Sequence, residues 1–185
     1  MAQASTLRAG HVVRIKGEFF KTIESTTHQG GGRMGLMVHA KLRNLATGAV
    51  AEPRFEVKQE IDIVPVERVK LQYSYKEGDN YVFMNPATFD QTPIAAAVFG
   101  PAARFLREND LIELEFFEGK PLSARFPEVV ELEVTSTGAG VKGAAKPATL
   151  ENGVELQVPD FIKQGDHIRV EVETGKYVDR VKAHA

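Results

Sequence analysis

The sequence contains no cysteine and no tryptophan. Without cysteine there is no disulfide, no thiolate metal ligand and no cysteine nucleophile, and the composition fits a reducing compartment. No apolar run approaches the roughly 18 residues that a membrane-spanning helix needs. Residues 1–5 have neither the basic stretch nor the apolar core of a signal peptide. We therefore expect a cytoplasmic protein with no membrane segment.

The motifs of common enzymes are also missing. The sequence has no nucleophile elbow, no P-loop and no Ser/His/Asp signature, and its five histidines show no metal-ligand spacing. Glu113 and Glu115 could do acid–base chemistry. On a strand of period two, however, they are more simply a solvated face. We therefore predict a protein that is not an enzyme, with no metal site and no cofactor.

The net charge is small, but the charged residues are unevenly distributed along the chain. The 185 residues carry a net charge of −2, yet residues 1–58 hold nine Lys or Arg against four Asp or Glu. Residues 59–135 hold seven against fourteen. A basic first third suggests that one end of the chain faces a polyanion. The alternative is an ordinary fluctuation in surface charge.

Short strands separated by turns dominate the pattern. Apolar residues alternate with polar ones over residues 36–43 and again over 69–75, which is typical of half-buried strands. Pro65 marks a boundary, because proline cannot donate to a β-ladder. A third set of strands begins at Val129, and a short helix is expected around residues 101–107. Three clusters of strands predict an all-β protein with three small barrels of about 60 residues each.

A glycine-rich hairpin tip in the first cluster carries a single arginine. Glycine lets the backbone bend sharply and approach a partner closely, and the planar guanidinium suits phosphate. The formal match to the dinucleotide pattern GxGxxG is rejected, since a strand rather than a helix follows it. An exposed arginine of no consequence is the alternative. The tip residues are Gly30, Gly31, Gly32, Arg33, Met34 and Gly35.

Residues 146–165 read KPATLENGVELQVPDFIKQG. This segment resembles the C-terminal signature of bacterial elongation factor P at every fixed position. Other fragments that agree include LRAG at residues 7–10, YVFMN at 81–85 and GKYVDR at 175–180. The resemblance covers essentially the whole chain. It implies an SH3-like, KOW-type barrel over residues 1–65, followed by two OB-fold barrels over residues 66–128 and 129–185.

The resemblance also implies a function. The family binds the 70S ribosome beside the peptidyl-tRNA and relieves stalling at consecutive prolines by positioning the tRNA 3′ end. Proline reacts poorly because its ring locks φ and its nitrogen is secondary, and holding the tRNA end still helps the ribosome's own centre to react. The alternative is a divergent paralogue that binds ribosome or RNA as a regulatory module without rescue. We expect a monomer whose partners are the ribosome, peptidyl-tRNA and ribosomal RNA.

The resemblance assigns roles residue by residue. Arg33 falls where the family carries its tip residue, which contacts the tRNA 3′ end and is modified in many members. Because it is an arginine, β-lysylation is excluded at this position, and rhamnosylation, which is known for arginine-type members, is a candidate modification that the resemblance does not by itself imply. Tyr177 and Arg180 resemble the family's RNA-contacting pair, and Lys146, in a third-domain loop, is a further RNA-binding candidate. Only Ala144 and Ala145 separate Gly143 from Lys146, so the loop that recognises the tRNA D-arm is short.

Overall fold

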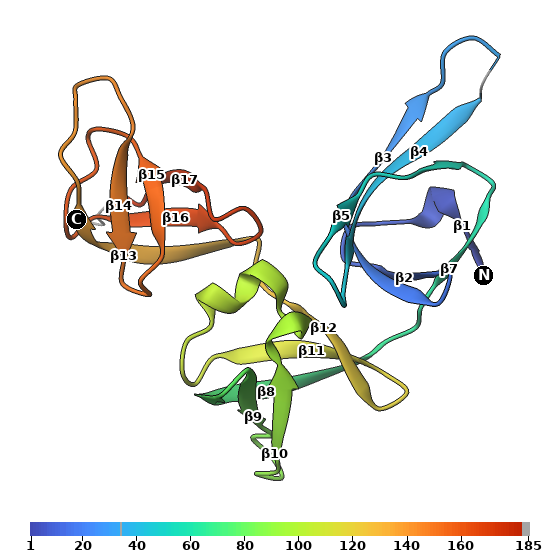
Figure 1. Cartoon of the computed structure of the whole chain (residues 1–185), viewed down its shortest axis with the longest axis horizontal. Coiled ribbons are helices and arrows are strands. Elements are labelled where there is room, and N and C mark those ends of the chain that lie inside the picture. The colour runs from blue at the N-terminus through green and yellow to red at the C-terminus, as the bar shows by residue number, and fades with distance from the viewer. Residues whose placement is uncertain (34, 183–185) are drawn as a thin grey trace. The chain divides into compact units, whose positions relative to one another are not determined.

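The computed structural model describes residues 1–33 and 35–182, and β-strands dominate it (Figure 1). The strands form three antiparallel sheets, and the regular helices in the described residues are short 3-10 turns. The all-β prediction is therefore confirmed. Among the described residues, no helix has both the length and the apolar character needed to cross a membrane.

The first sheet is built on the period-two segments near the N-terminus. In β4, Val38, Ala40 and Leu42 are buried while their neighbours are partly exposed, as the alternation predicts. The strands run in the order β1-β7-β2-β3-β4-β5, with β6 paired to β4. The elements are β1 (Ala2–Gln3), η1 (Ala4–Thr6), β2 (Val12–Ile15), β3 (Glu18–Gln29), β4 (Leu36–Asn44), β5 (Val50–Ala51), β6 (Arg54–Glu56) and β7 (Glu60–Ile63).

The second sheet has the order β10-β9-β8-β11-β12. Its core side includes Leu71, Phe83 and Leu114, all of which are buried. Its elements are β8 (Glu67–Glu77), β9 (Asn80–Met84), β10 (Gln91–Ala95), η2 (Ala96–Val98), β11 (Leu111–Phe117) and β12 (Lys120–Arg125).

The third sheet has the order β15-β14-β13-β16-β17. Its elements are β13 (Val129–Thr137), β14 (Lys146–Leu150), β15 (Glu155–Val158), β16 (His167–Glu171) and β17 (Tyr177–Arg180). Apolar residues from these strands and from the segment after β15 form one closed core.

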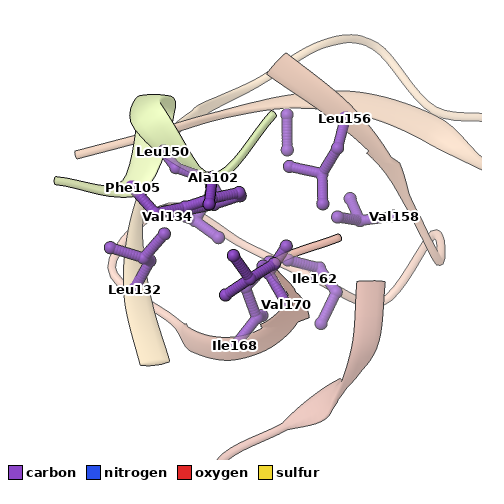
Figure 2. Close-up of a cluster of buried hydrophobic side chains, with 12 residues drawn as sticks. Ala102, Phe105, Leu132, Val134, Leu150, Leu156, Val158, Ile162, Ile168 and Val170 are labelled. Carbon is purple, nitrogen blue, oxygen red and sulfur yellow. The ribbon is translucent and has the colours of Figure 1, made fainter. Parts of the chain in front are cut away.

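The short helix expected around residues 101–107 is a 3-10 helix, η3 (Gly100–Phe105). It ends early because the Asp110 carboxylate accepts the Arg107 backbone N–H over 3.0 Å. Ala102 and Phe105 are buried in the core of the third sheet, and Figure 2 shows them beside Val134 and Leu150. This helix therefore completes a core whose strands come from another part of the sequence.

The chain divides into two compact units. One comprises Met1–Gly100 and Leu111–Arg125, and the other comprises Pro101–Asp110 and the chain from Phe126 onward. The first two sheets thus share a unit. The domain boundaries placed after residues 65 and 128 stay predictions.

Glu115 corrects one expectation from the sequence. Its side chain is 1% exposed, although the period of β11 assigned it to a solvated face with Glu113. The β8–β11 ladder runs in unbroken register from Leu111 to Phe116, so Glu115 keeps the face of Glu113, and Lys21 of the first sheet covers that face at Glu115. The carboxylate is tolerated inside because Lys21, Arg68 and Ser123 donate hydrogen bonds to it.

Candidate RNA-binding site

The predicted tip lies at the end of the β3–β4 hairpin. Gln29 and Leu36 form the last cross-strand pair, and the Gly30 N–H donates to the Gly35 carbonyl oxygen over 3.1 Å. Gly31, Gly32 and Arg33 lie in the turn that these contacts close, and Met34 lies outside the described residues.

The backbone of the tip depends on glycine. Gly32 has a φ of +70°, a left-handed conformation that side chains with a Cβ rarely adopt. A Cβ built on Gly31, Gly32 or Gly35 would meet no other atom within 4 Å, so the tip is open on all these sides. Arg33 follows Gly32 directly and is exposed. Its guanidinium is therefore available to a partner.

The far part of the hairpin extends beyond its sheet. On the edge of β3 that faces away from β4, β2 pairs with β3 only as far as Lys21. On the edge of β4 that faces away from β3, β6 pairs with Met37–His39. In the described chain no strand pairs with residues 23–29 on that edge of β3. Figure 1 shows the blue hairpin of β3 and β4 projecting past the other strands of its sheet. Arg33 therefore lies at the end of a long hairpin arm, beyond the last residues that β2 and β6 pair with.

Two histidines face one another on this arm. The rings of His28 and His39 meet edge to face, with 4.8 Å between their centroids, and His28 Nε2 lies 3.0 Å from the Thr26 hydroxyl. Partial desolvation lowers the pKa of His39, and the charges of Arg54 and His28 lower it further. His39 is therefore largely neutral at neutral pH. Among the described residues no group of three His, Asp or Glu side chains could hold a metal ion.

In the third sheet, Tyr177 and Arg180 share one face of β17 despite their odd spacing. Tyr177 lies opposite Val170 and Arg180 opposite Ile168, whereas Asp179 lies opposite Arg169. The register therefore skips Val178, which is the extra residue of a bulge. Directly opposed residues in an antiparallel pair point to the same side. The bulge thus brings both side chains onto the face of the buried residues Ile168 and Val170.

The surroundings of the pair differ. Tyr177 packs partly against the core, and burial raises the pKa of its hydroxyl, followed by the negative charge of Asp179. The Arg180 guanidinium lies 5.4 Å from the ring centre of Phe161 and 3.9 Å from the Asp166 carboxylate. Its side chain is 49% exposed. Tyr177 can donate a hydrogen bond at neutral pH, and Arg180 can add charge.

Phe161 is a residue that the sequence reasoning missed. Its side chain is 51% exposed, and it lies against Arg180. An aromatic residue directly after Pro159 and Asp160, two residues that favour a turn, was the available signal. An exposed ring held by a guanidinium is a surface on which a nucleotide base can stack.

Lys146 does not lie in a loop, as expected, but is the first residue of β14, opposite Val158. Its partner strand there is β15, whereas the ladder between β14 and β13 reaches only Ala148. Its aliphatic chain runs past Gly140, where a Cβ would lie 2.9 Å from Lys146 Cδ. In the sheet order, β13 and β16 separate β14 from β17. Lys146 is therefore not a direct neighbour of β17 in the sheet.

The whole chain resembles one family of proteins. Residues 3–60 match the elongation factor P KOW-like domain, residues 66–124 match the elongation factor P OB domain, and residues 128–180 match the elongation factor P C-terminal domain. These matches confirm the KOW-like and OB assignments predicted for the fold.

Individual relatives give the same result. Elongation factor P of Pelotomaculum thermopropionicum is 39% identical over 186 residues, which cover 98% of this chain and 100% of the relative. Elongation factor P of Kocuria rhizophila is 38% identical, covering 98% and 99%. A solved structure of eukaryotic translation initiation factor 5A from Methanococcus jannaschii aligns with a TM-score of 0.48 at 14% identity, covering 67% of this chain and 92% of that one. The matched domains and the two relatives show that the chain belongs to the elongation factor P family of translation factors.

Proposed function

We propose that this protein binds the ribosome beside the peptidyl-tRNA and relieves stalling at consecutive prolines by holding the tRNA 3′ end. The observation that carries the proposal is an exposed Arg33 at the end of a long hairpin arm. A guanidinium there can donate paired hydrogen bonds to phosphate or to nucleotide oxygens. The family membership supports the ribosome as the site of action.

No side chain of the protein needs to react in this mechanism. Restricting the motion of a reactant in a productive geometry accelerates a reaction without new chemistry. The protein therefore acts as a positioning factor in the cytoplasm, as a monomer and without a cofactor. Lys146, Tyr177 and Arg180 contribute contacts to transfer RNA or ribosomal RNA.

Arg33 is also the proposed site of rhamnosylation. It is exposed, and Gly31, Gly32 and Gly35 leave open space around it. A modifying enzyme could therefore reach the guanidinium without unfolding the hairpin. The intact mass of the protein from its native source is expected to exceed the sequence mass by one deoxyhexose residue, and after digestion the peptide that contains Arg33 is expected to carry the increase. An unmodified mass would contradict rhamnosylation of Arg33.

The direct test is reconstituted translation of a message that encodes three consecutive prolines. The wild type is expected to raise the yield of full-length product, and Arg33→Ala is expected to lose most of that effect. Arg54→Ala is the matched control, because Arg54 is another exposed arginine of the same sheet that lies on β6, opposite His39, rather than in the tip turn. Equal stalling with and without the wild type would contradict the proposal. Ribosome binding without rescue would instead identify the regulatory module.

A further inference from the structure

The most deeply buried charged group that the proposed function leaves unexplained is the Glu115 carboxylate. Ser123 Oγ donates a hydrogen bond to it over 2.7 Å, and Arg68 Nε lies 3.3 Å away. Lys21 Nζ makes the third contact, and the Lys21 side chain is only 15% exposed. Every partner of this carboxylate is thus a donor, as a buried charge requires.

These four residues come from two different sheets. Glu115, Ser123 and Arg68 belong to β11, β12 and β8 of the second sheet, whereas Lys21 belongs to β3 of the first. Lys21 and Glu115 are 94 positions apart in the sequence. Both sheets lie in the same compact unit. The ion pair therefore joins the barrel that carries the hairpin arm to the barrel that follows it.

Aromatic side chains cover the same junction. The rings of Phe19 and Phe117 lie 5.7 Å apart, one from each sheet. The Arg14 guanidinium lies 6.0 Å from the centre of the first ring and 5.7 Å from the second, and it pairs with Asp62 over 2.8 Å. These contacts add apolar contact area between the two sheets, but flat rings can slide past one another without losing it. The directional bonds to the carboxylate do not tolerate it, because any slip would leave a buried charge unpaired.

The position of Lys21 on β3 gives this pair long-range influence. Gln29 lies eight residue steps beyond Lys21 on β3, which at about 3.3 Å per step is a lever of about 26 Å. A rotation of about 10° at Lys21 would move the end of such an arm by about 5 Å. A misplacement of about 1 Å can cost a reaction about 100-fold in rate.

We propose that Lys21 and Glu115 are positioning residues that fix the direction of the β3–β4 arm against the second sheet. They thereby determine the position of Arg33 relative to the second sheet. The identity of the partner that Arg33 contacts rests on the proposed function. The coupling of the two sheets through Lys21 and Glu115 does not depend on it. The contacts at the base of the arm then determine the direction in which the rigid arm extends.

The test exploits the absence of cysteine from the chain. Cysteines introduced at Gln29 and Lys70, both exposed, would carry the only two spin labels, one near the tip and one on β8. Pulsed electron paramagnetic resonance then measures the distance distribution between them. The double variant Lys21→Met/Glu115→Leu replaces the buried pair by apolar side chains, which commonly preserve stability. We expect its distribution to be clearly broader than that of the wild type at a similar melting temperature.

Two further variants make the measurement decisive. Arg125→Met is the matched control, because it breaks an ion pair with Glu113 that lies wholly within the second sheet, and it should leave the distribution unchanged. Glu115→Gln keeps the shape of the side chain and an oxygen that can accept the Ser123 hydrogen bond, but it removes the negative charge. It should broaden the distribution even if the double variant fails to fold. A wild-type width in both Glu115 variants would overturn the proposal.

The functional consequence is measured separately, on chains without labels. The double variant is expected to lose proline rescue when Arg33 is present and to change little when Arg33→Ala is already in place. Rescue at the wild-type level despite a broadened distribution would overturn the positioning role. If Arg33→Ala itself has no effect on rescue, the proposed function fails, while the distance measurement still decides whether the two sheets are coupled through this pair.

Discussion

Tyr177 and Arg180 lie on the same face of β17 because Val178 is an extra residue in its ladder with β16. On a regular strand, residues three apart point to opposite faces. The bulge places the tyrosine hydroxyl and the guanidinium on one face, with the exposed ring of Phe161 beside Arg180, and it is there that we propose a contact with RNA. A local irregularity of the backbone thus assembles the proposed contact.

The first prediction concerns the charge of Arg180. Arg180→Ala should weaken binding to the ribosome several-fold and reduce the slope of log affinity against log salt by about 1, because one phosphate contact is lost. The exposed ion pair with Asp166 should contribute at most about 1 kcal/mol to stability. Binding titrations at several salt concentrations measure the slope, and urea unfolding measures the stability.

Arg169→Ala is the matched control for this variant. Arg169 is similarly exposed, at 51%, but it pairs with Asp179 on the other face of the same two strands. Its removal should leave the salt slope at the wild-type value. Equal slopes in all three proteins would show that Arg180 contacts no phosphate.

The second prediction follows from the buried carboxylate of Glu115. Burial would raise its pKa, but the hydrogen bond and charge of Lys21, with help from Ser123 and Arg68, outweigh burial and lower the pKa below 4.5. A lowered carboxyl pKa stabilises the folded state above the unfolded pKa, and this stabilisation is lost as pH falls through the folded pKa. Glu115→Gln should therefore cost about 1–3 kcal/mol at pH 7. The difference from wild type should shrink as pH falls below 4.5.

Urea unfolding at pH 7 and at a series of values below 4.5 checks this dependence. Glu113→Gln provides the comparison from the same strand, because that carboxylate is 28% exposed and pairs with Arg125 over 3.4 Å. It should cost less than about 1 kcal/mol at pH 7. A difference for Glu115→Gln that stays constant with pH would mean that its charge does not stabilise the fold.

The features that the sequence predicted are those with local causes. The alternation in residues 36–43 predicted the buried row of Val38, Ala40 and Leu42, because side chains of a strand alternate between two faces. The glycines around Arg33 predicted a turn, because their backbone freedom belongs to each residue alone.

The features that the sequence did not predict depend on distant partners. Glu115 is buried because Lys21 approaches it from 94 positions away, and no period within β11 encodes that. The bulge at Val178 is defined by its register with β16 rather than by its own residue type. The 3-10 helix that carries Phe105 joins a core whose strands begin at Val129. Such long-range packing overrides local patterns.

The third prediction compares two glycines in the connection between β13 and β14. A Cβ on Gly138 would lie 2.6 Å from Pro147 Cγ, whereas a Cβ on Gly140 would lie 2.9 Å from Lys146 Cδ. Neither glycine has a positive φ, so the variants Gly138→Ala and Gly140→Ala differ mainly in the neighbour that they meet. The proline ring is fixed by its bonds and by the pairing of Pro147 with Gln157. The lysine chain can change rotamer and move away.

Gly138→Ala should therefore destabilise the protein by about 1–3 kcal/mol, as overpacking against a rigid group does. Gly140→Ala should cost less than about 1 kcal/mol, because the flexible side chain yields. Urea unfolding of the two variants beside the wild type measures both values. The Gly138 N–H also donates to the Pro147 carbonyl oxygen over 2.8 Å, so a backbone shift that relieved the clash would weaken this bond. Equal losses of stability for the two variants would mean that the start of β14 moves as a whole. Pro147 would then not hold Lys146 in place.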